Sequence, residues 1–142
     1  MGKKRIVKKG SEDGGSGRGG SSRANRRKLD SGILSVEATY NNTKVCLTDA
    51  GGNVVAWSSS GSLGFSGAKK GTPFAAAKVG ELLGDRALQM GMKEVAVVVS
   101  GVGAGRESSI RAFATKGIHI QSIKDTTPVP HNGPRPKKPR RV

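Results

Sequence analysis

The sequence predicts a small α/β domain: a mixed sheet of about five strands with two helices, in the order βββαβαβ, and a basic arm at each end. Three observations predict it. Alternating apolar and polar residues recur in short segments that turn residues separate, which is typical of strands. A threonine–proline pair opens a long helical segment that ends at a glycine. The net charge of +15 on 142 residues lies mostly near the two ends of the chain.

The first half of the domain is predicted to contain three strands joined by short turns. Residues 33–40 alternate between apolar and polar side chains, and Asn41-Asn42 is a turn signal. Residues 43–49 alternate again and lead through a glycine-containing turn into a strand over 54–59. Strands with such short connections pair with their neighbours, so we expect an antiparallel meander.

The main helix has a clear start and a clear stop. Thr72 is the expected N-cap, Pro73 takes the first helical position, and Gly91 ends the helix after about Met90. Gly80 and Gly84 lie one turn apart inside it. We expect these two glycines to let the helix pack closely on the sheet.

The second half continues with a strand, a short helix and a last strand. Residues 95–99 form a continuous apolar run, which is expected of a central strand covered on both faces. A glycine loop then leads to a short helix from about Ser108 to Lys116, with Gly117 as its stop. Residues 118–123 alternate as the final strand.

Charge divides the chain into three parts. Residues 1–30, a Gly/Ser-rich arm, carry a net charge of +7, and the proline-rich tail 128–142 carries +5. Residues 31–127, the expected globular domain, carry only +3. Neither arm has the apolar content to offset its ordering entropy. We therefore expect both arms to be disordered when free and to order on a polyanion, whose phosphates they neutralise.

Composition argues against several classes of protein. No run approaches the ~18 consecutive apolar residues of a membrane span, and the N-terminus lacks the apolar region of a secretory signal. A single cysteine, Cys46, excludes an internal disulfide and cannot complete a structural zinc site with two histidines. We expect no metal, no cofactor and no catalytic residue. With five aromatic residues, base stacking is expected to contribute little beside phosphate contacts.

One glycine-rich loop could bind phosphate. Residues 101–107 leave a strand and open a helix, where backbone amides and the helix dipole favour an anion. Arg106 stands where a dinucleotide-binding motif has Gly or Ala, and no P-loop lysine follows. The alternative is a flexible strand-to-helix connection, although Arg106 and Arg111 favour a phosphate of a polymer.

A second loop, residues 64–72, carries two cations just before the main helix. Lys69 and Lys70 lie where the helix dipole disfavours positive charge, and a bound anion would relieve this. The alternative is an exposed loop with two solvated lysines.

Several short motifs occur in an order that resembles one family. They are Asn41-Asn-Thr43, Asp49-x-x-Gly52-Asn53, Gly64-Phe65, Thr72-Pro-Phe-Ala-Ala76, Gly105-Arg-Glu107, Ile110-Arg-Ala112 and Pro128-x-Pro-His-Asn-Gly133. Over about residues 30–142 the chain is similar to the universal small-ribosomal-subunit protein eleven family, in its bacterial and organellar form.

The resemblance implies a ribonuclease-H-like fold that serves as an RNA scaffold. It implies a structural constituent of the platform of the small ribosomal subunit, bridging helices of the ribosomal RNA near the messenger exit and the Shine–Dalgarno cleft. The implied neighbours are small-subunit proteins seven and eighteen, with protein twenty-one and initiation factor three as further candidates. We expect a protein of the bacterial cytoplasm rather than of an organelle, neither bound to a membrane nor a homo-oligomer.

The family's RNA-facing positions carry over onto the first turn, the two loops and the tail. They are Asn41, Asn42, Thr43, Gly64, Phe65, Lys69, Lys70, Thr72, Arg106, Arg111, His131, Asn132, Arg135, Lys137, Lys138, Arg140 and Arg141. Ser66 departs from the family, which usually has Lys or Arg there, so we expect a weaker loop contact.

Two other functions stay open at this point. A metal-dependent nuclease would use the same implied fold, and it needs clustered carboxylates around metal ions. Glu37, Asp49 and Asp125 are the one candidate set for such a cluster. A free nucleic-acid chaperone would instead use the basic arms to bind any polyanion.

Overall fold

The computed structural model describes residues 28–141, where the elements follow one another in the predicted order. The predicted arm 1–30 therefore lies, apart from residues 28–30, outside the described residues. The elements are β1 (Ser31–Ala38), β2 (Thr43–Asp49), β3 (Val54–Ser59), the 3-10 helices η1 (Gly61–Leu63) and η2 (Gly67–Gly71), α1 (Pro73–Gln89), β4 (Glu94–Ser100), α2 (Gly105–Ala114) and β5 (His119–Asp125).

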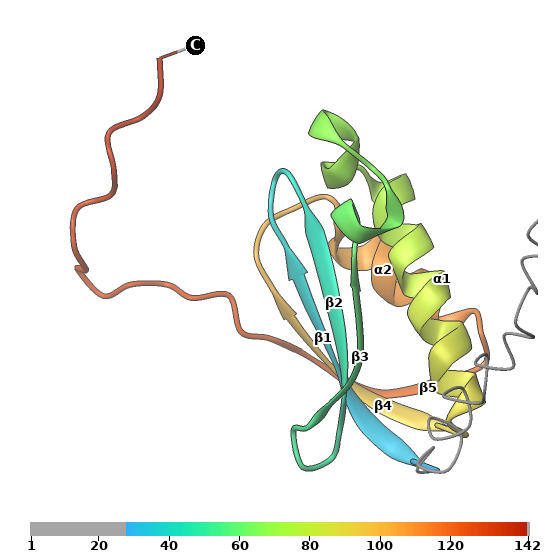
Figure 1. The fold of residues 1–142 in the computed structure, drawn as a ribbon. Helices are drawn as coiled ribbons and strands as arrows, with labels where there is room; N and C mark the ends of the chain where they lie inside the picture. The colour runs from blue at the N-terminus through green and yellow to red at the C-terminus, as the bar shows by residue number, and fades with distance from the viewer. Residues whose placement is uncertain (1–27, 142) are drawn as a thin grey trace, which may run out of the picture.

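The five strands form one mixed sheet in the order β3-β2-β1-β4-β5. β1 pairs antiparallel with β2, and β2 with β3, so the predicted meander is confirmed. β4 pairs parallel with both β1 and β5. Figure 1 shows α1 and α2 side by side on one face of this sheet.

The core lies between that face and the two helices. Alternate strand residues such as Leu34, Leu47 and Val97 pack with Leu83 of α1 and Phe113 of α2, and all are buried. Burying apolar area in this way stabilises the fold by about 25 cal/mol per Å². The strand residues of this core all lie on the one face of the sheet that the helices cover.

The expectation that β4 is covered on both faces is wrong. Val95, Val97 and Val99 are buried, whereas the side chains between them, Ala96 and Val98, are only half-buried. The reason is that both helices cover the same face, so among the described residues no helix covers the opposite one (Figure 1). We call that opposite face the open face of the sheet.

The start and stop signals of α1 are confirmed. The Thr72 Oγ1 atom accepts a hydrogen bond from the Ala75 amide at 3.4 Å, and Pro73 takes the first turn. Gly91, with φ of +75°, follows the last turn in the left-handed conformation that favours glycine.

The short helix begins earlier than predicted, at Gly105 rather than near Ser108, and ends at Ala114. Glycine has low helix propensity, so local pattern placed Gly105 in the loop. The structure nevertheless places Gly105 in the helix, because packing at this position requires a residue without a side chain. A Cβ on Gly105 would lie 2.2 Å from the Thr43 Oγ1 atom and 2.7 Å from the Ala76 Cβ atom. Only glycine lets the first turn of α2 approach so closely.

The prediction that Gly80 and Gly84 pack against the sheet is also wrong. A Cβ on Gly80 would lie 2.3 Å from the Ser109 carbonyl oxygen, and one on Gly84 would lie 2.6 Å from Cγ of Lys116. Both glycines therefore face α2 and not the sheet. They let the two helices pack closely, while Val79 and Leu83 of α1 join the core.

β5 is an edge strand with one irregularity in its register. Val95 pairs with Ile120 and Ala96 with Ser122, so Gln121 has no partner at that position. Most of β5 is exposed to solvent. Within residues 28–141, no helix is long and apolar enough to cross a bilayer.

Candidate nucleic-acid interface

The register of the sheet brings the loops of the domain to one end. Glu37, near the end of β1, pairs with Lys44 of β2 and with Ser100 of β4. Lys44 in turn pairs with Ser59, near the end of β3. The turn after β1 and the loops after β3 and β4 consequently meet there. We call residues 39–43, 60–72, 101–106 and 126–127 the loop end.

Both helices begin at the loop end, and the tail starts there. Thr126 donates its amide proton to the Val99 carbonyl at 2.8 Å, which holds the first tail residue beside β4. The N-termini of α1 and α2 lie next to the turn between β1 and β2 (Figure 1). Helix N-termini carry partial positive charge and free amides, so this end favours anions.

Close approach between the loops depends on glycine. A Cβ on Gly71 would lie 2.2 Å from the Tyr40 carbonyl oxygen, and one on Gly103 would lie 2.2 Å from the Thr39 carbonyl oxygen. Both loops are therefore pressed against the backbone of the same turn. Any larger residue would force them apart and change the shape of this end.

The loop over 101–107 is held in place by two of its own amides and is not a loose connection. The Gly103 amide donates to the Ala38 carbonyl at 3.0 Å, and the Gly101 amide donates to Thr127 Oγ1 at 3.2 Å. These two amides already have partners within the chain. The packed loop instead serves to seat α2 and the tail.

Arg106 joins this loop to the end of β5. Its Nη2 atom lies 2.7 Å from Asp125 Oδ2, and Nη1 donates to the Gly101 carbonyl and, at 3.4 Å, to Thr127 Oγ1. Asp125 Oδ1 also accepts from the Thr127 amide at 2.9 Å. Hydrogen bonds from Thr127 and then Arg106 hold the pKa of the Asp125 carboxyl below its usual range. These contacts place the Arg106 guanidinium between the loop, the end of β5 and the residue just before the tail.

The lysines of the second loop stand beside the start of α1. Lys69 is exposed and Lys70 half-buried, and among residues 28–141 neither is part of an ion pair. Thr72 Oγ1 donates to the Lys69 carbonyl at 2.7 Å as well as capping the helix. This arrangement fixes two cations next to a helix N-terminus, as the sequence predicted.

The turn residues divide by burial. Asn41 is exposed, and Asn42 is half-buried with its amide donating to Thr39 Oγ1 at 3.1 Å. The Thr43 side chain has no exposed surface and lies under Gly105. Thr43 can therefore influence a ligand only through the shape of the turn.

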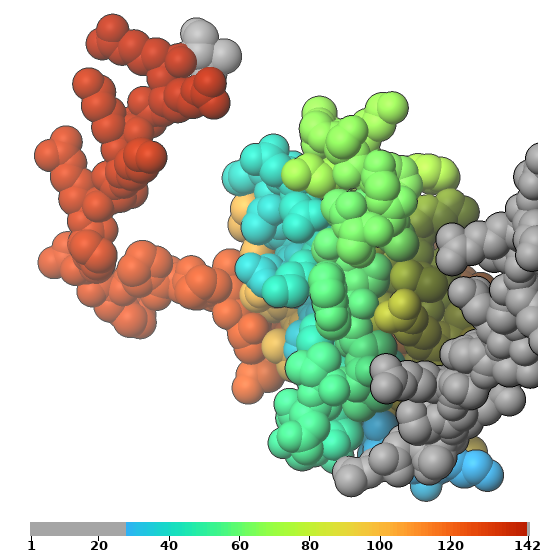
Figure 2. Space-filling view, viewed as in Figure 1, coloured from blue at the N-terminus to red at the C-terminus, as the bar shows by residue number. Residues whose placement is uncertain are grey.

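The remaining expected site residues lie at the surface. Gly64 is exposed, Phe65 is half-buried, and Arg111 is exposed on α2. The seven tail positions are all exposed: His131, Asn132, Arg135, Lys137, Lys138, Arg140 and Arg141. Figures 1 and 2 show the tail leaving the domain on the side of the sheet opposite the helices.

The aromatic rings are more accessible than their low number indicates. Tyr40 is 78% exposed, Phe74 64% and Trp57 54%, and Phe113 alone is fully buried. Phe74 packs edge-on against Phe65 with ring centroids 6.1 Å apart, and the Lys78 Nζ atom lies 5.4 Å from the Phe74 centroid. Three of the five aromatic rings are therefore mostly exposed and accessible for stacking.

Sequence reasoning missed Phe74 and Lys78 as interface candidates. The helical spacing of the sequence could have identified Phe74. The buried positions of α1 recur at Ala76, Val79 and Leu83, and this spacing puts Phe74 on the opposite, solvent-facing side. A single exposed apolar residue would need no explanation, but Phe74 lies beside Phe65, so the two rings form a small apolar patch at the start of α1.

The carboxylates named for a nuclease do not converge. Asp49 pairs with Gly32 at one end of β1, whereas Glu37 lies near the other end. Asp49 accepts hydrogen bonds from the Asn53 amide and side chain at 2.9 and 3.2 Å, and Asp125 is paired with Arg106. In the part of the chain that the structure describes, no group of three His, Cys, Asp or Glu could hold a metal.

Cations, aromatic rings and helix N-termini gathered at one end of an α/β domain define a class: a basic binding protein for a polyanion. Comparison with known proteins gives the family. The family profile described as ribosomal protein S11 matches residues 32–141, and the chain belongs to this family. Members of this family are structural ribosomal proteins, so the chain is a ribosomal protein and not an enzyme.

Two curated relatives agree along almost their whole length. The small ribosomal subunit protein uS11 of Gloeobacter violaceus is 52% identical over 125 residues, covering 88% of this chain and 96% of that protein. The protein of the same name from Thermosynechococcus vestitus is 51% identical over 120 residues, covering 84% and 92% respectively. The resemblance inferred from the ordered motifs is confirmed.

Proposed function

We propose that this chain, as a structural protein of the small ribosomal subunit, binds the ribosomal RNA of that subunit through its loop end and its tail. One observation carries the proposal: the turn after β1, the two loops, both helix N-termini and the start of a cationic tail occupy the same end of the domain. The relatives are named as small-subunit proteins, which supports the choice of RNA.

The domain and the tail contribute in different ways. The packed loop end supplies a rigid shape, with Lys69 and Lys70 beside the start of α1 to bind phosphate. The tail supplies five cations and no acid, so it can thread between RNA helices and screen their repulsion. Contacts of this kind position the protein without reading much sequence.

The finer assignment rests on the family resemblance. It places the chain on the platform, bridging RNA helices near the messenger exit and the Shine–Dalgarno cleft, beside proteins seven and eighteen. Protein twenty-one and initiation factor three are further proposed neighbours. The bacterial origin of both relatives supports a ribosome of the bacterial cytoplasm. We expect the chain to be present there without forming a homo-oligomer.

The salt dependence of RNA binding tests the proposal. If about eight phosphates are neutralised, log K should fall against log salt with a slope of roughly −6 to −7. A slope shallower than about −3 would contradict it. The Lys69→Ala variant should reduce the slope by about one, whereas Lys93→Ala, an exposed lysine just before β4, should leave it unchanged.

A second measurement separates a ribosomal protein from a free chaperone. Small subunits carrying the chain are sedimented after a high-salt wash. A protein held by both the loop end and the tail stays with the particle. A chaperone that binds any polyanion through its arms is washed off, and that result would overturn the proposal.

A further inference from the structure

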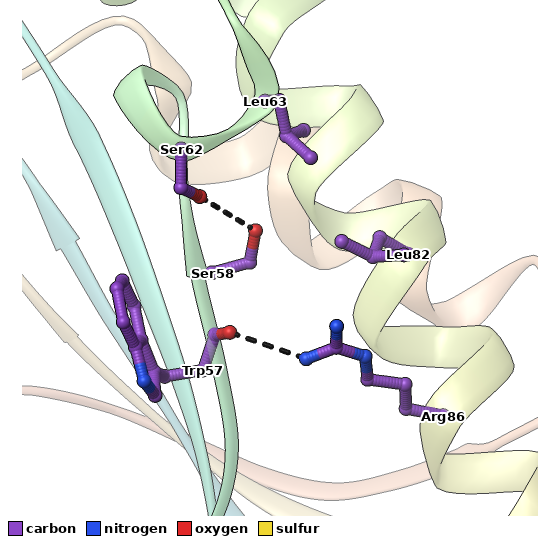
Figure 3. Close-up of a pocket in the computed structure, with 6 residues that line it drawn as sticks. All are labelled: Trp57, Ser58, Ser62, Leu63, Leu82 and Arg86. Carbon is purple, nitrogen blue, oxygen red and sulfur yellow. Dashed lines mark hydrogen bonds between the residues drawn. The ribbon is translucent and has the colours of Figure 1, made fainter. Parts of the chain in front are cut away.

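The open face of the sheet carries an exposed tryptophan. Trp57 of β3 lies opposite Cys46 of β2, and its side chain is 54% exposed. Its strand neighbours Ala56 and Ser58 are buried on the helix side. Figure 3 shows the indole on the side of β3 away from α1. The ring is therefore no part of the core.

The helix side of β3 faces α1. A groove of about 400 Å³ lies there, lined by residues that include Ser58, Leu82 and Arg86. The Arg86 Nη1 atom donates to the Trp57 carbonyl at 3.4 Å (Figure 3). This contact engages the backbone of Trp57 and leaves its indole free.

The indole borders a shallow hollow that the Lys44 side chain also lines. A hollow of about 250 Å³ on the open face is lined by Lys44, Cys46, Val54 and Trp57. Lys44 is exposed, and Val54 is 62% exposed. No acidic residue lines the hollow, although Glu37 lies opposite Lys44 on β1. A flat ring beside a cation suits a planar base that is linked to a phosphate.

The charge around this face favours a polyanion over an apolar protein partner. The tail leaves the domain on the same side of the sheet (Figures 1 and 2) and carries five Lys and Arg with no Asp or Glu. Lys44 and Lys124 add exposed cations on β2 and β5, which Glu37 and Glu94 balance on β1 and β4, so the excess positive charge beside this face comes from the tail. Whatever covers this face must lie beside these positive charges.

We propose that the open face is a second RNA contact, in which an unpaired base stacks on the Trp57 indole and Lys44 contacts a neighbouring phosphate. The inference rests on the proposed function, because the RNA is that of the small subunit. It adds a stacking contact on the open face to the phosphate contacts already argued.

The full chain has a single tryptophan, so its fluorescence reports on this site alone. Small-subunit ribosomal RNA is titrated into the protein, and both indole emission and affinity are measured. Emission should be quenched on binding. Trp57→Ala should weaken binding by about tenfold, within the range measured for single stacked bases, and leave the salt slope unchanged. Trp57→Phe, which keeps a ring, should retain most of the affinity.

Two further variants separate stacking from charge and from general surface effects. Lys44→Ala should reduce the salt slope by about one. Leu88→Ala removes another exposed apolar side chain, 47% exposed on α1, and should change nothing. Far-UV circular dichroism checks that each variant is folded.

The outcomes distinguish this proposal from the proposed function. If the chain binds RNA with a steep salt slope while emission and Trp57→Ala affinity are unchanged, the stacking proposal is overturned alone. If Trp57→Ala binds free RNA normally but loses a protein neighbour in reconstituted subunits, the face docks a protein, and the RNA contact is overturned. If the chain does not bind RNA at all, the proposed function is overturned, and the stacking proposal that rests on it is overturned as well.

Discussion

Arg106 and Asp125 form an ion pair, Nη2 to Oδ2 at 2.7 Å, between the first turn of α2 and the last residue of β5. The same guanidinium donates to the Gly101 carbonyl, and Thr127 donates to the same carboxylate. Two segments, residues 101–106 and 125–127, are thereby joined where the basic tail begins. The pair holds Thr127, just before the tail, against the loop over 101–106.

If Arg106 acts by positioning the tail, its shape matters more than its charge. Arg106→Lys keeps the positive charge but loses the planar fork that contacts Asp125 and Gly101 together. We expect Arg106→Lys to weaken RNA binding nearly as much as Arg106→Ala, and both to reduce hydrogen-exchange protection of the Gly101 amide. Full RNA affinity in Arg106→Lys would indicate a direct phosphate contact instead.

The Asp125 carboxyl makes part of the stability depend on pH. Its folded-state pKa is lowered, chiefly by Thr127 and then by Arg106, so its contribution is complete above the unfolded value near 3.8. That contribution is lost as pH falls through the lowered folded-state pKa. The difference in Tm between the native chain and Asp125→Asn should therefore shrink from about pH 5 to about pH 2. A difference that is constant over this range would contradict the pairing.

Gly80 tests the contact between the two helices. Alanine normally favours a helix over glycine by about 1 kcal/mol, but a Cβ here would lie 2.3 Å from the Ser109 carbonyl oxygen. Overpacking of this kind costs about 1–3 kcal/mol, so Gly80→Ala should lower the free energy of unfolding in urea. Gly61→Ala is the control, because its Cβ would meet Lys70 Cδ at an ordinary 3.7 Å. A stabilised Gly80→Ala variant would show that the helices are not so close.

The tail is expected to supply most of the salt-dependent affinity. Deleting residues 128–142 removes five cations and no buried residue of the core cluster. The salt slope of RNA binding should fall by about four, with Tm nearly unchanged, and incorporation into small subunits should weaken. Native occupancy in subunits after this deletion would contradict the role given to the tail.

Short-range chemistry in the sequence was enough for the order of elements. Alternation predicted the meander, and Thr72, Pro73 and Gly91 predicted both ends of α1, because caps and turns depend on neighbouring residues. The candidate cations could be chosen in the same way, since Lys69 and Lys70 precede a helix start along the chain. Their gathering at one end followed only from the strand register.

The elements of this domain and the division of charge between domain and tail follow from the order of the amino acids alone. Folding set which residues each surface presents. It buried Thr43, paired Arg106 with Asp125, turned Gly80 toward α2 and left Trp57 on an open face. The physical reason is range: capping and alternation act over a few residues, whereas ion pairs, close approach and exposure depend on segments that only folding brings together.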